Sequence, residues 1–348
     1  MRQPVLGFIG IHAGKRTDQP ISQNETLALL FESVGYRVVR ASAVRRPALR
    51  TLHQIWSLLS WRHVDAVVIA VFSGRSFWIA DFASFLAKRV GQSKVILFMH
   101  GGNLGVFGPE NRAWVTRVFD RADLLLAPSD FLADAFRPWG YDVHVIPNVL
   151  SIQSYRYDRR TEARPALLWM RTFHEHYDPL LAVDVLARVC EVHPGATMTM
   201  GGADHGLLQA TRDRAAELGV ADRITFAGYL DPQTKAQAFA DHDVFLNTNV
   251  VDNMPVSVLE AAASGLVPVA TSVGGIPALL TDGVDARLVP ARDAPAMADA
   301  VLGLLADPET YAELSVGARA LAVRSSWPAV YALWRDDLHT LLPHLAMA

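Results

Sequence analysis

Two acidic residues eight positions apart, Asp252 and Glu260, lie in the part of the sequence richest in potential chemistry. A strand predicted over Val244–Thr248 precedes them, so Asp252 falls in the loop at the carboxyl end of that strand. Pro255 can begin a helix in this loop because the first turn does not need its missing N–H, and Glu260 then lies about one and a half turns into the helix. Two carboxylates placed in this way can hold opposite parts of one polyhydroxylated ligand. A surface acid and a partner of the helix dipole would give the same spacing.

The start of the same helix offers hydrogen-bond donors to an anion. The first amides of a helix have no partner within it, so they can bind a phosphate group. A second turn with free backbone donors, Gly274-Gly275, follows the next predicted strand. The sequence therefore predicts a site for a phosphate-bearing ligand at the helix start, over Asn253, Met254, Pro255 and Val256.

Short apolar strands alternate with helical patterns along almost the whole chain, which is typical of parallel sheets covered by helices on both faces. The pattern stops over the polar stretch 148–165 and then starts again. We therefore predict two doubly wound α/β domains, over 1–150 and 165–325, and a terminal helix over 326–348 that returns toward the first domain. In such sheets ligands bind beyond the carboxyl ends of the strands. The predicted strands are Val5–Ile11, Tyr36–Ala41, Ala66–Phe72, Lys94–His100, Leu124–Pro128, Val143–Ile146, Ala166–Met170, Thr197–Gly201, Ile224–Gly228, Val244–Thr248, Pro268–Thr271 and Ala286–Val289.

Composition excludes several classes of protein. A chain of 348 residues that is 51% hydrophobic can build two sizeable cores, and its single cysteine rules out a disulfide framework. No apolar run reaches the length of a membrane span, and the first residues lack the pattern of a signal peptide, so a cytoplasmic protein is expected. The first 150 residues carry 17 Lys and Arg against 11 Asp and Glu, whereas the rest of the chain is acidic. This asymmetry suggests two lobes with different partners, none of them nucleic acid, because no basic stripe with interleaved aromatic residues is present.

The segment from 252 to 277 resembles the donor-binding signature of the retaining glycosyltransferases of family 4, which have the two-lobed GT-B fold. That signature has two acids eight apart, a helix of small residues, a glycine, an apolar strand and a Gly-Gly-x-Pro turn. The resemblance continues in ADLLLAPSDFLADAF and SSWPAVYALWRDDL and covers nearly the whole chain. It implies two Rossmann-like domains that face each other across a cleft, the first binding the acceptor and the second the nucleotide-sugar. The matching elements are Asp252, Glu260, Ala261–Gly265, Val267–Thr271 and Gly274–Pro277.

The resemblance also implies roles for residues of the second domain. Glu260 would hold the ribose hydroxyls of the nucleotide-sugar, and Asp252 would contact hydroxyls of the transferred sugar. Arg171 matches the arginine that contacts the donor diphosphate, and a fixed guanidinium suits the charge that develops on the leaving group. His176 stands where the family usually has a lysine, so either it supplies a pH-dependent positive charge or another group takes over. A structural ion pair for Arg171 and an ordinary loop position for His176 are the alternatives.

Further residues are implied on both domains. His100 follows a predicted strand where the family often places a histidine near the sugar and the acceptor, although a strand-end histidine with satisfied hydrogen bonds would look the same. Gly14 belongs to a glycine loop after the first strand that resembles the family's loop near the donor phosphates. The residues implied for the base and ribose pocket are Met200, Gly201, Gly202 and Tyr229.

The resemblance implies retention, and no side chain is well placed as a nucleophile, so we expect attack on the same face from which the diphosphate leaves. The protein would then contribute positioning and charge stabilisation. No histidine and cysteine cluster has the spacing of metal ligands, so we expect neither a metal nor another cofactor, the nucleotide-sugar being a substrate. Two alternatives stay open: a degenerate transferase that binds nucleotide-sugars or serves in assembly, and a nucleotide-sugar epimerase on the same fold.

The segment from Arg45 to His63 bears on the acceptor. Leu49, Leu52, Ile55, Trp56 and Leu59 recur at helical spacing, and Arg45, Arg46, Arg50 and Arg62 flank them. Basic residues beside tryptophan on an amphipathic helix are typical of peripheral contact with an anionic membrane. An ordinary helix packed on the sheet has the same apolar stripe. Membrane contact would make a lipid-linked saccharide, as in polysaccharide biosynthesis, a natural acceptor.

Overall fold

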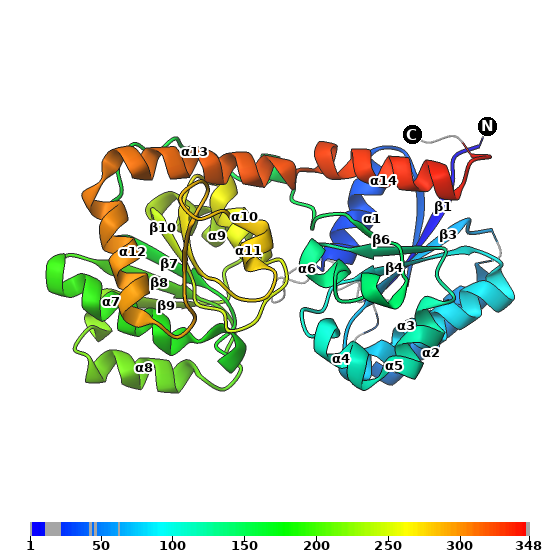
Figure 1. Ribbon diagram of the computed structural model, residues 1–348, viewed down its shortest axis with the longest axis horizontal. Helices are drawn as coiled ribbons and strands as arrows, with labels where there is room; N and C mark the ends of the chain where they lie inside the picture. The colour runs from blue at the N-terminus through cyan, green and yellow to red at the C-terminus, as the bar shows by residue number, and fades with distance from the viewer. Residues whose placement is uncertain (1, 11–21, 42–43, 45–46, 62, 346–348) are drawn as a thin grey trace. The chain divides into compact units, whose positions relative to one another are not determined.

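The chain folds into two compact units in the computed structural model (Figure 1). The first unit comprises Met1–Val149 and Trp327–Ala348, and the second comprises Leu150–Ser326. The structure describes residues 2–10, 22–41, 44, 47–61 and 63–345. The polar stretch after residue 150 therefore belongs to the second unit, and the terminal segment belongs to the first.

The first unit contains a six-stranded parallel sheet in the order β2-β1-β3-β4-β5-β6. β3 is buried at every position and β4 at every position but its first, as expected for parallel strands with helices on both faces. Each of these strands was predicted, and the observed ends differ from the predicted ones by no more than two residues. The strands are β1 (Val5–Ile9), β2 (Arg37–Ala41), β3 (Ala66–Val71), β4 (Lys94–Met99), β5 (Leu124–Ala127) and β6 (Val143–Val145).

Two groups of helices cover this sheet. The first group packs on one face around Phe8 and Phe98, and it consists of α1 (Gln23–Ser33) and the terminal helix α14 (Trp327–Leu341) (Figure 1). The second group packs on the other face, and it consists of α2 (Pro47–Ser60), α3 (Phe77–Leu86) and α5 (Arg112–Phe119). The shorter helices are α4 (Leu104–Glu110) and α6 (Asp130–Ala133). The sequence pattern predicts one helix over Glu110–Arg121, but α5 is shorter, because the chain leaves helical geometry at Asn111 before α5 begins.

Aromatic side chains attach α14 to the first unit. The ring of Phe31 on α1 meets those of Trp327 and Trp334 edge-on, at centroid distances of 5.2 and 5.5 Å. Such pairs contribute roughly 0.5–1.5 kcal/mol each beyond the burial of their surface. Trp334 is fully buried, so the last helix completes the core of a domain that begins more than three hundred residues earlier.

The second unit has the strand order β12-β11-β10-β7-β8-β9, again all parallel. The chain order runs outward in opposite directions from the central pair β7 and β10, so the topological switch point lies between these two strands. All six strands were predicted, with ends within one residue. They are β7 (Ala166–Met170), β8 (Thr197–Gly201), β9 (Ile224–Gly228), β10 (Val244–Asn247), β11 (Val267–Thr271) and β12 (Arg287–Val289). The two doubly wound α/β domains predicted from the sequence are thus confirmed.

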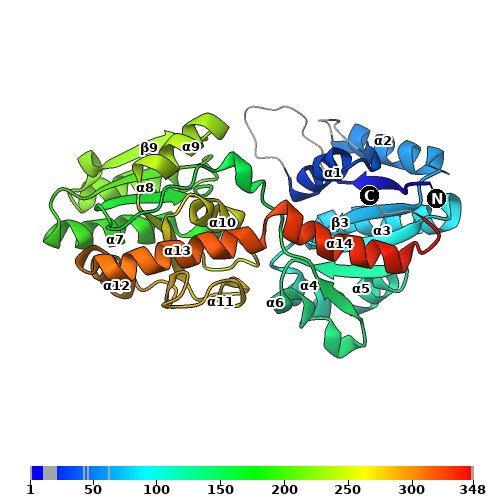
Figure 2. The same cartoon turned by 90° about the horizontal axis from the view of Figure 1, so that it is seen from above.

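Helices also cover both faces of the second sheet (Figure 2). One face carries α7 (Pro179–Val192), α8 (Leu208–Glu217) and α12 (Ala294–Ala306). The other carries α9 (Pro232–Asp241), α10 (Val256–Ala263) and α13 (Pro308–Arg324), with the short helix α11 (Ile276–Leu279) beside them. α10 is almost entirely alanine and other small or apolar residues, and this lets it pack closely against β10, β11 and α13.

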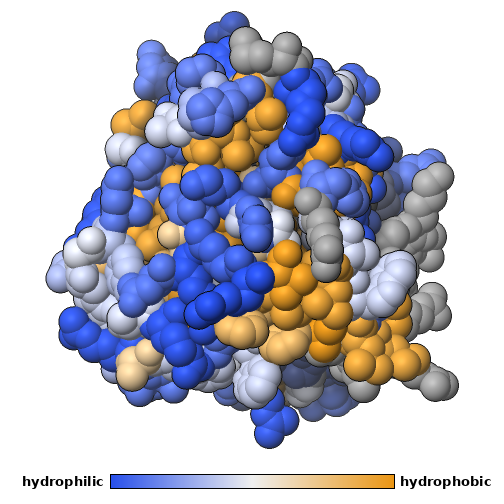
Figure 3. Space-filling model, turned by 90° about the vertical axis from the view of Figure 1, so that its right-hand side faces the viewer, coloured by the Kyte–Doolittle hydropathy of each residue, from blue (hydrophilic) through white to orange (hydrophobic). Residues whose placement is uncertain are grey.

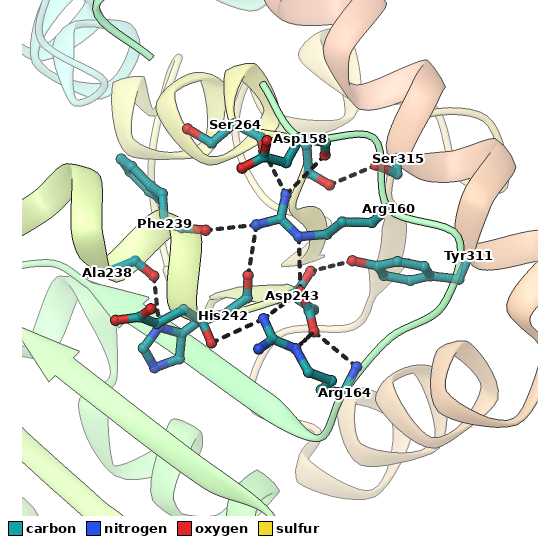
Figure 4. A network of polar contacts seen from close by, with 12 residues as sticks. Asp158, Arg160, Arg164, Ala238, Phe239, His242, Asp243, Ser264, Tyr311 and Ser315 are labelled. Atoms are coloured by element: carbon teal, nitrogen blue, oxygen red, sulfur yellow. Dashed lines mark hydrogen bonds and ion pairs between the residues drawn. The ribbon is translucent and has the colours of Figure 1, made fainter. Parts of the chain in front are cut away.

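The polar stretch that follows residue 150 is anchored to the second unit through ion pairs to the buried carboxylate of Asp243 (Figure 4). Arg160 Nε donates to Asp243 Oδ1 at 2.8 Å, and its Nη atoms donate to the carbonyl oxygens of Ser264 and Phe239 at 2.5 and 2.7 Å. Arg164 Nε donates to the other carboxylate oxygen of Asp243 at 2.7 Å. Around Arg160 the segment is held by these polar contacts, which need no hydrophobic period in the sequence.

Candidate active site

The switch point of the second sheet brings together two residues far apart in the sequence. Arg171 follows β7 directly, and Asp252 lies in the loop after β10. These strands are neighbours and parallel, so their carboxyl ends meet at one edge of the sheet. Arg171 Nη2 donates to Asp252 Oδ2, and the two side chains form an ion pair. Ligands of doubly wound sheets bind at this point of the fold.

Three hydrogen bonds fix the loop that carries Asp252. Asn249 Nδ2 donates to Asp252 Oδ2 at 2.7 Å, and the Asn253 amide donates to Oδ1 at 2.7 Å. The Gly275 amide donates to the Asp252 carbonyl oxygen at 2.9 Å. A Cβ atom on Gly274 would lie 2.1 Å from that carbonyl oxygen, so the Gly274-Gly275 turn approaches the loop as only glycine can. The carboxylate is therefore held in one orientation before any ligand binds.

Arg171 also lies against an aromatic ring. Its guanidinium carbon is 4.9 Å from the ring centroid of Tyr177, a cation–π contact that fixes the plane of the guanidinium. The Nε atom is buried and has no hydrogen-bond partner among the described residues. Two further buried atoms near this edge are likewise without a partner there, Asn249 Oδ1 and Ser257 Oγ. Buried polar groups are nearly always hydrogen-bonded, so these atoms mark a place where a ligand or water completes the structure.

His176 stands on a short 3₁₀ turn between β7 and α7 (Glu175–Tyr177). Its carbonyl oxygen accepts from the Val250 amide at 2.9 Å, which ties this turn to the Asp252 loop. Its imidazole is exposed and meets the ring of His174 edge-on at 4.6 Å. The backbone of His176 thus lies beside the Asp252 loop, while among the described residues its ring makes no hydrogen bond or ion pair with Arg171 or Asp252.

Glu260 lies in a separate group of contacts on α10. Its Oε1 atom accepts hydrogen bonds from Tyr155 Oη at 2.6 Å and from Lys235 Nζ at 2.5 Å. Burial and the neighbouring Glu260 charge raise the pKa of Tyr155 far above its usual value, so the phenol stays protonated and donates. Neither partner of Glu260 could be predicted from the sequence. Tyr155 is 105 residues from Glu260 in the chain, and no sequence pattern predicts a contact between the two.

Glycine is required at the end of β8 because atoms of neighbouring segments approach the backbone there closely. A Cβ atom on Gly202 would lie 1.7 Å from the Arg171 carbonyl oxygen, and one on Gly201 would meet Leu230 Cδ1 at 2.6 Å. Tyr229 and Leu230 line an open pocket together with residues of α9. The glycines therefore let the ends of β7 and β8 approach each other closely behind Arg171.

The predicted phosphate-binding residues surround the start of α10. Pro255 is the N-cap of the helix and Val256 its first residue, so the helix begins one residue later than predicted. Asn253 and Met254 are buried in the loop that leads to it. The amides at the start of α10 therefore lie next to the Asp252 loop.

His100 follows β4 in the first unit, where it is packed between aromatic rings. Its ring centroid is 4.3 Å from that of Phe98 and 5.7 Å from that of Phe72. Burial lowers its pKa to about 4, so the imidazole is neutral at pH 7. Its Nε2 atom is buried without a partner in the described part of the chain. Gly14, the other residue predicted in the first domain, lies outside the described residues.

One pair of aspartates with the spacing of a metal motif has a structural role instead. Asp241 is the last residue of α9 and Asp243 directly precedes β10, at the edge of the sheet opposite Arg171 and Asp252. Asp243 is saturated by Arg160 and Arg164, and its pKa is lowered because these hydrogen bonds outweigh the effect of burial (Figure 4). Within the described ranges, no three His, Cys, Asp or Glu side chains are grouped as they would be around a metal ion.

Comparisons with known proteins agree with this architecture. The family model for glycosyl transferases group 1 matches residues 164–307, and the model for glycosyltransferase family 4 matches residues 16–154. A D-inositol 3-phosphate glycosyltransferase of Mycobacterium marinum is 31% identical over 206 residues, which are 54% of this chain and 43% of that protein. A phosphatidyl-myo-inositol mannosyltransferase of Mycobacterium leprae is 28% identical over 268 residues, 72% of this chain and 68% of that protein. This chain spans half or less of the curated D-inositol 3-phosphate glycosyltransferases it matches.

Solved structures show the same fold at low sequence identity. A sucrose-phosphate synthase from Thermosynechococcus elongatus superposes with a TM-score of 0.79 at 15% identity, covering 98% of this chain and 99% of that one. Anabaena HepE in complex with UDP gives 0.74 at 16% identity, covering 97% and 100%. Two doubly wound sheets of this kind define the GT-B class. Together with the family models, they show that the chain belongs to the group 1, family 4 glycosyltransferases.

Proposed function

We propose that this protein moves a sugar from a nucleotide-sugar to a hydroxyl acceptor, with retention of configuration at the anomeric carbon. The observation that carries the proposal is the Arg171–Asp252 pair at the switch point, next to the start of α10. A cation, oriented backbone amides and a carboxylate at one edge suit a ligand that joins a diphosphate to a polyhydroxylated ring. In the proposed complex, Arg171 and the α10 amides bind the diphosphate and Asp252 binds sugar hydroxyls.

The proposed chemistry needs charge stabilisation rather than a protein nucleophile. The bond from the anomeric carbon to the diphosphate oxygen breaks while the acceptor oxygen bonds to that carbon on the same face. The acceptor's proton passes to the leaving diphosphate oxygen. Arg171 stabilises the negative charge that grows on the diphosphate, so we propose that the reaction needs no metal. Neutral His100, on the first unit, has a free ring nitrogen to bond a hydroxyl of the sugar or acceptor.

The relatives support this proposal at the level of ligand class. Structures of HepE are described with UDP, with UDP and glucose, and with UDP-glucose, and the mycobacterial relatives are named for transfer to inositol derivatives. A nucleoside diphosphate sugar is therefore the class of donor we propose here. The nucleotide and the sugar are left for experiment to assign.

Binding and turnover test the proposal together. UDP, GDP, ADP and dTDP sugars are added to the wild type and to Arg171→Gln, and thermal unfolding is followed for each. A donor present at a hundred times its dissociation constant stabilises the folded state by about 2.7 kcal/mol. We expect one nucleotide class to raise the melting temperature of the wild type but not of the variant. NMR of the product then reads the anomeric configuration, and transfer in EDTA reads the metal requirement.

The outcomes separate this proposal from its alternatives. Binding of a donor without transfer to any of a panel of acceptors would favour a degenerate transferase. Conversion of the nucleotide-sugar without an acceptor would favour an epimerase. Absence of any shift with all four nucleotide classes would contradict the donor site itself.

We also propose that the first unit contacts an anionic membrane through α2. Leu49, Leu52, Trp56 and Leu59 lie along one side of this helix, and Leu52 and Trp56 are 60% and 66% exposed. Figure 3 shows apolar side chains gathered in the lower part of a face of the molecule that includes α2. Of the flanking arginines, Arg45, Arg46 and Arg62 and the Arg50 side chain lie outside the described residues. No helix among the described residues is long and apolar enough to span a bilayer.

Vesicle flotation tests this contact. The wild type is expected to rise with vesicles that contain anionic phosphatidylglycerol at low salt, and less so at high salt. Trp56→Ser with Leu52→Ser should stay at the bottom. Val192→Ser is the matched control, because Val192 is equally exposed but lies on α7 of the second unit. Sedimentation of the wild type without the vesicles at low salt would overturn the proposal, and with it the argument for a lipid-linked acceptor.

A further inference from the structure

The carboxylate of Glu260 is held by two donors that come from different parts of the second unit. Tyr155 follows a 3₁₀ turn (Ile152–Ser154) just after the chain enters this unit, and Lys235 lies on α9. Both donate to the same atom, Oε1, at 2.6 and 2.5 Å. The Glu260 side chain is only 12% exposed, so an unpaired charge there would be costly.

Both donors are themselves fixed. The ring of Tyr155 packs edge-on against Phe239 at 6.0 Å and contacts the apolar core around α10. Lys235 Nζ lies 5.9 Å from the centroid of the Tyr155 ring, so the ammonium and the phenol converge on Glu260 from neighbouring positions. The side chain of Asp231 caps α9 through the Gln233 and Thr234 amides at 2.9 Å, which fixes the first turn that carries Lys235. Lys235 is the only lysine of the sequence after residue 150.

The double contact leaves the second carboxylate oxygen for a ligand. Within the described structure, no hydrogen bond to Glu260 Oε2 accompanies the two at Oε1. A carboxylate whose one oxygen is held by two protein donors cannot rotate freely, and its other oxygen then points in a fixed direction. Vicinal hydroxyls, such as those of a ribose, need an acceptor with a fixed position and direction to bind well.

We propose that Tyr155 and Lys235 are positioning residues for nucleotide recognition: they fix Glu260 so that Oε2 accepts from the ribose hydroxyls of the donor. The proposal rests on the function proposed above and deepens it, because it concerns the same donor site. It assigns a role to two residues that do not themselves need to touch the nucleotide. The adjacent ammonium also keeps the site from presenting an uncompensated negative charge to a ligand that is itself an anion.

Calorimetric titration with UDP and GDP tests this role, each beside its 2′,3′-dideoxy analogue. Tyr155→Phe keeps the ring and removes the hydroxyl, and Lys235→Gln removes the charge. For the ribonucleotide that binds the wild type, we expect affinity to fall about three- to tenfold in each variant, which is the net contribution of one ordinary hydrogen bond. For the dideoxy analogue, which has no hydroxyls for Glu260 to bind, we expect the variants and the wild type to agree within about twofold.

Turnover gives a second readout that mere loss of stability would not reproduce. With the donor varied, KM should rise by the same factor as the dissociation constant while kcat stays within about twofold, because the ribose contact is made equally in the ground and transition states. Lys235→Arg restores a cation and should recover most of the affinity. In a Glu260→Gln background, Tyr155→Phe should have no further effect.

Matched controls and contrary outcomes keep this test decisive. Tyr157→Phe removes a hydroxyl two residues away, next to Arg319 rather than Glu260, and should bind like the wild type. Arg214→Gln breaks an ion pair with Asp184 on the same unit and should also bind the nucleotide like the wild type. Equal loss of affinity for the ribonucleotide and its dideoxy analogue, or no loss for either, would overturn the positioning role while leaving the donor site intact. Failure of the wild type to bind any ribonucleotide would instead overturn the function on which the inference rests.

Discussion

Arg171 and Asp252 face each other in the absence of a ligand, and this pairing sets what each can do for a donor. The guanidinium already shares its charge with a carboxylate that Asn249 and the Asn253 amide hold in place. A diphosphate that approaches Arg171 must compete with Asp252 for the same donors. The two residues should therefore affect binding in opposite directions.

Asp252→Asn keeps the shape of the side chain and removes its charge. We expect diphosphate affinity to rise about two- to fivefold, because Arg171 is released, and sugar transfer to fall by about 10² or more, because a contact to the transferred sugar is weakened. Calorimetry with the nucleoside diphosphate and initial rates with the full donor measure the two effects. Arg171→Gln is the counterpart, and it should lower both the affinity for the diphosphate and the rate of sugar transfer. A fall in diphosphate affinity with Asp252→Asn as large as that with Arg171→Gln would contradict this account.

The spacing of Asp252 and Glu260, and the place of Arg171 after a strand, could be predicted because they depend only on neighbours in the chain. The partners of these residues could not. Asn249, Tyr155 and Lys235 reach the site through the packing of separate elements, and nothing in their own sequence surroundings distinguishes them. The role of His176 stays a prediction: its place in the motif suggests a positive charge near the diphosphate, and its exposed ring packs on His174.

At the scale of elements, the polar segment around Arg160 connects the start of β10 to the end of α10 through hydrogen bonds. Arg160 makes an ion pair with Asp243 and donates to the carbonyl oxygens of Ser264 and Phe239, and its side chain is only 9% exposed. Arg160→Met should lower the free energy of unfolding of the second unit by about 3–5 kcal/mol, since it leaves buried acceptors without a donor. Urea unfolding measures the change. Arg156→Gln, at a position 83% exposed and paired with Asp158, should change it by less than about 0.5 kcal/mol.

A histidine–aspartate contact joins β6 to α14 and should make the docking of the last helix depend on pH. His144 Nδ1 lies 2.7 Å from Asp337 Oδ1, and Asp142 approaches Nε2 at 3.4 Å. Partial burial alone would lower the pKa of His144, but the hydrogen bond and charge of Asp337 outweigh it and raise the pKa above its usual 6.5. A raised pKa in the folded state means stabilisation that is complete below pH 6.5 and is lost as the pH rises through the folded-state pKa.

The expected difference in melting temperature between the wild type and His144→Gln is therefore larger at pH 5.5 than at pH 8.5. Asp337→Asn should remove the same pH dependence, because it removes the charge that raises the pKa. Melting curves at the two pH values, for the wild type and both variants, decide the matter. A difference that stays constant with pH, or grows toward pH 8.5, would show that the imidazole is not charged in this contact.

The elements themselves were largely predictable. Strands in both sheets are short apolar runs bounded by turns, and every one was located to within two residues. Helix ends were harder to place, because the break at Asn111 and the five-residue π-helical turn Ala87–Gly91 after α3 depend on packing rather than on periodicity. The role of the segment near Arg160 was missed for a related reason, since polar anchoring has no sequence period.

At the scale of the whole molecule, the chain passes between its two units twice, after Val149 and before Trp327. The two passages lie side by side within the second unit, where the Leu150 amide donates to the Ser325 carbonyl oxygen at 2.7 Å. Each unit has its own sheet and its own core clusters, so each can unfold as a cooperative body. The side chains proposed to bind the nucleoside diphosphate, Arg171 and Glu260, both belong to the second unit.

Seven of the eight tryptophans belong to the first unit and one, Trp169, to the second, so the tryptophan fluorescence of the chain comes mainly from the first unit. Tryptophan fluorescence should follow the unfolding of the first unit, whereas calorimetry records both. A saturating nucleoside diphosphate should therefore raise the calorimetric transition of the second unit and leave the main fluorescence transition almost unchanged, because ligand stabilises only the body that binds it. Glu260→Gln is the control and should reduce the calorimetric shift alone. An equal shift in both signals would mean that the nucleotide draws the units into one cooperative body, and the first unit would then have to supply part of the donor site.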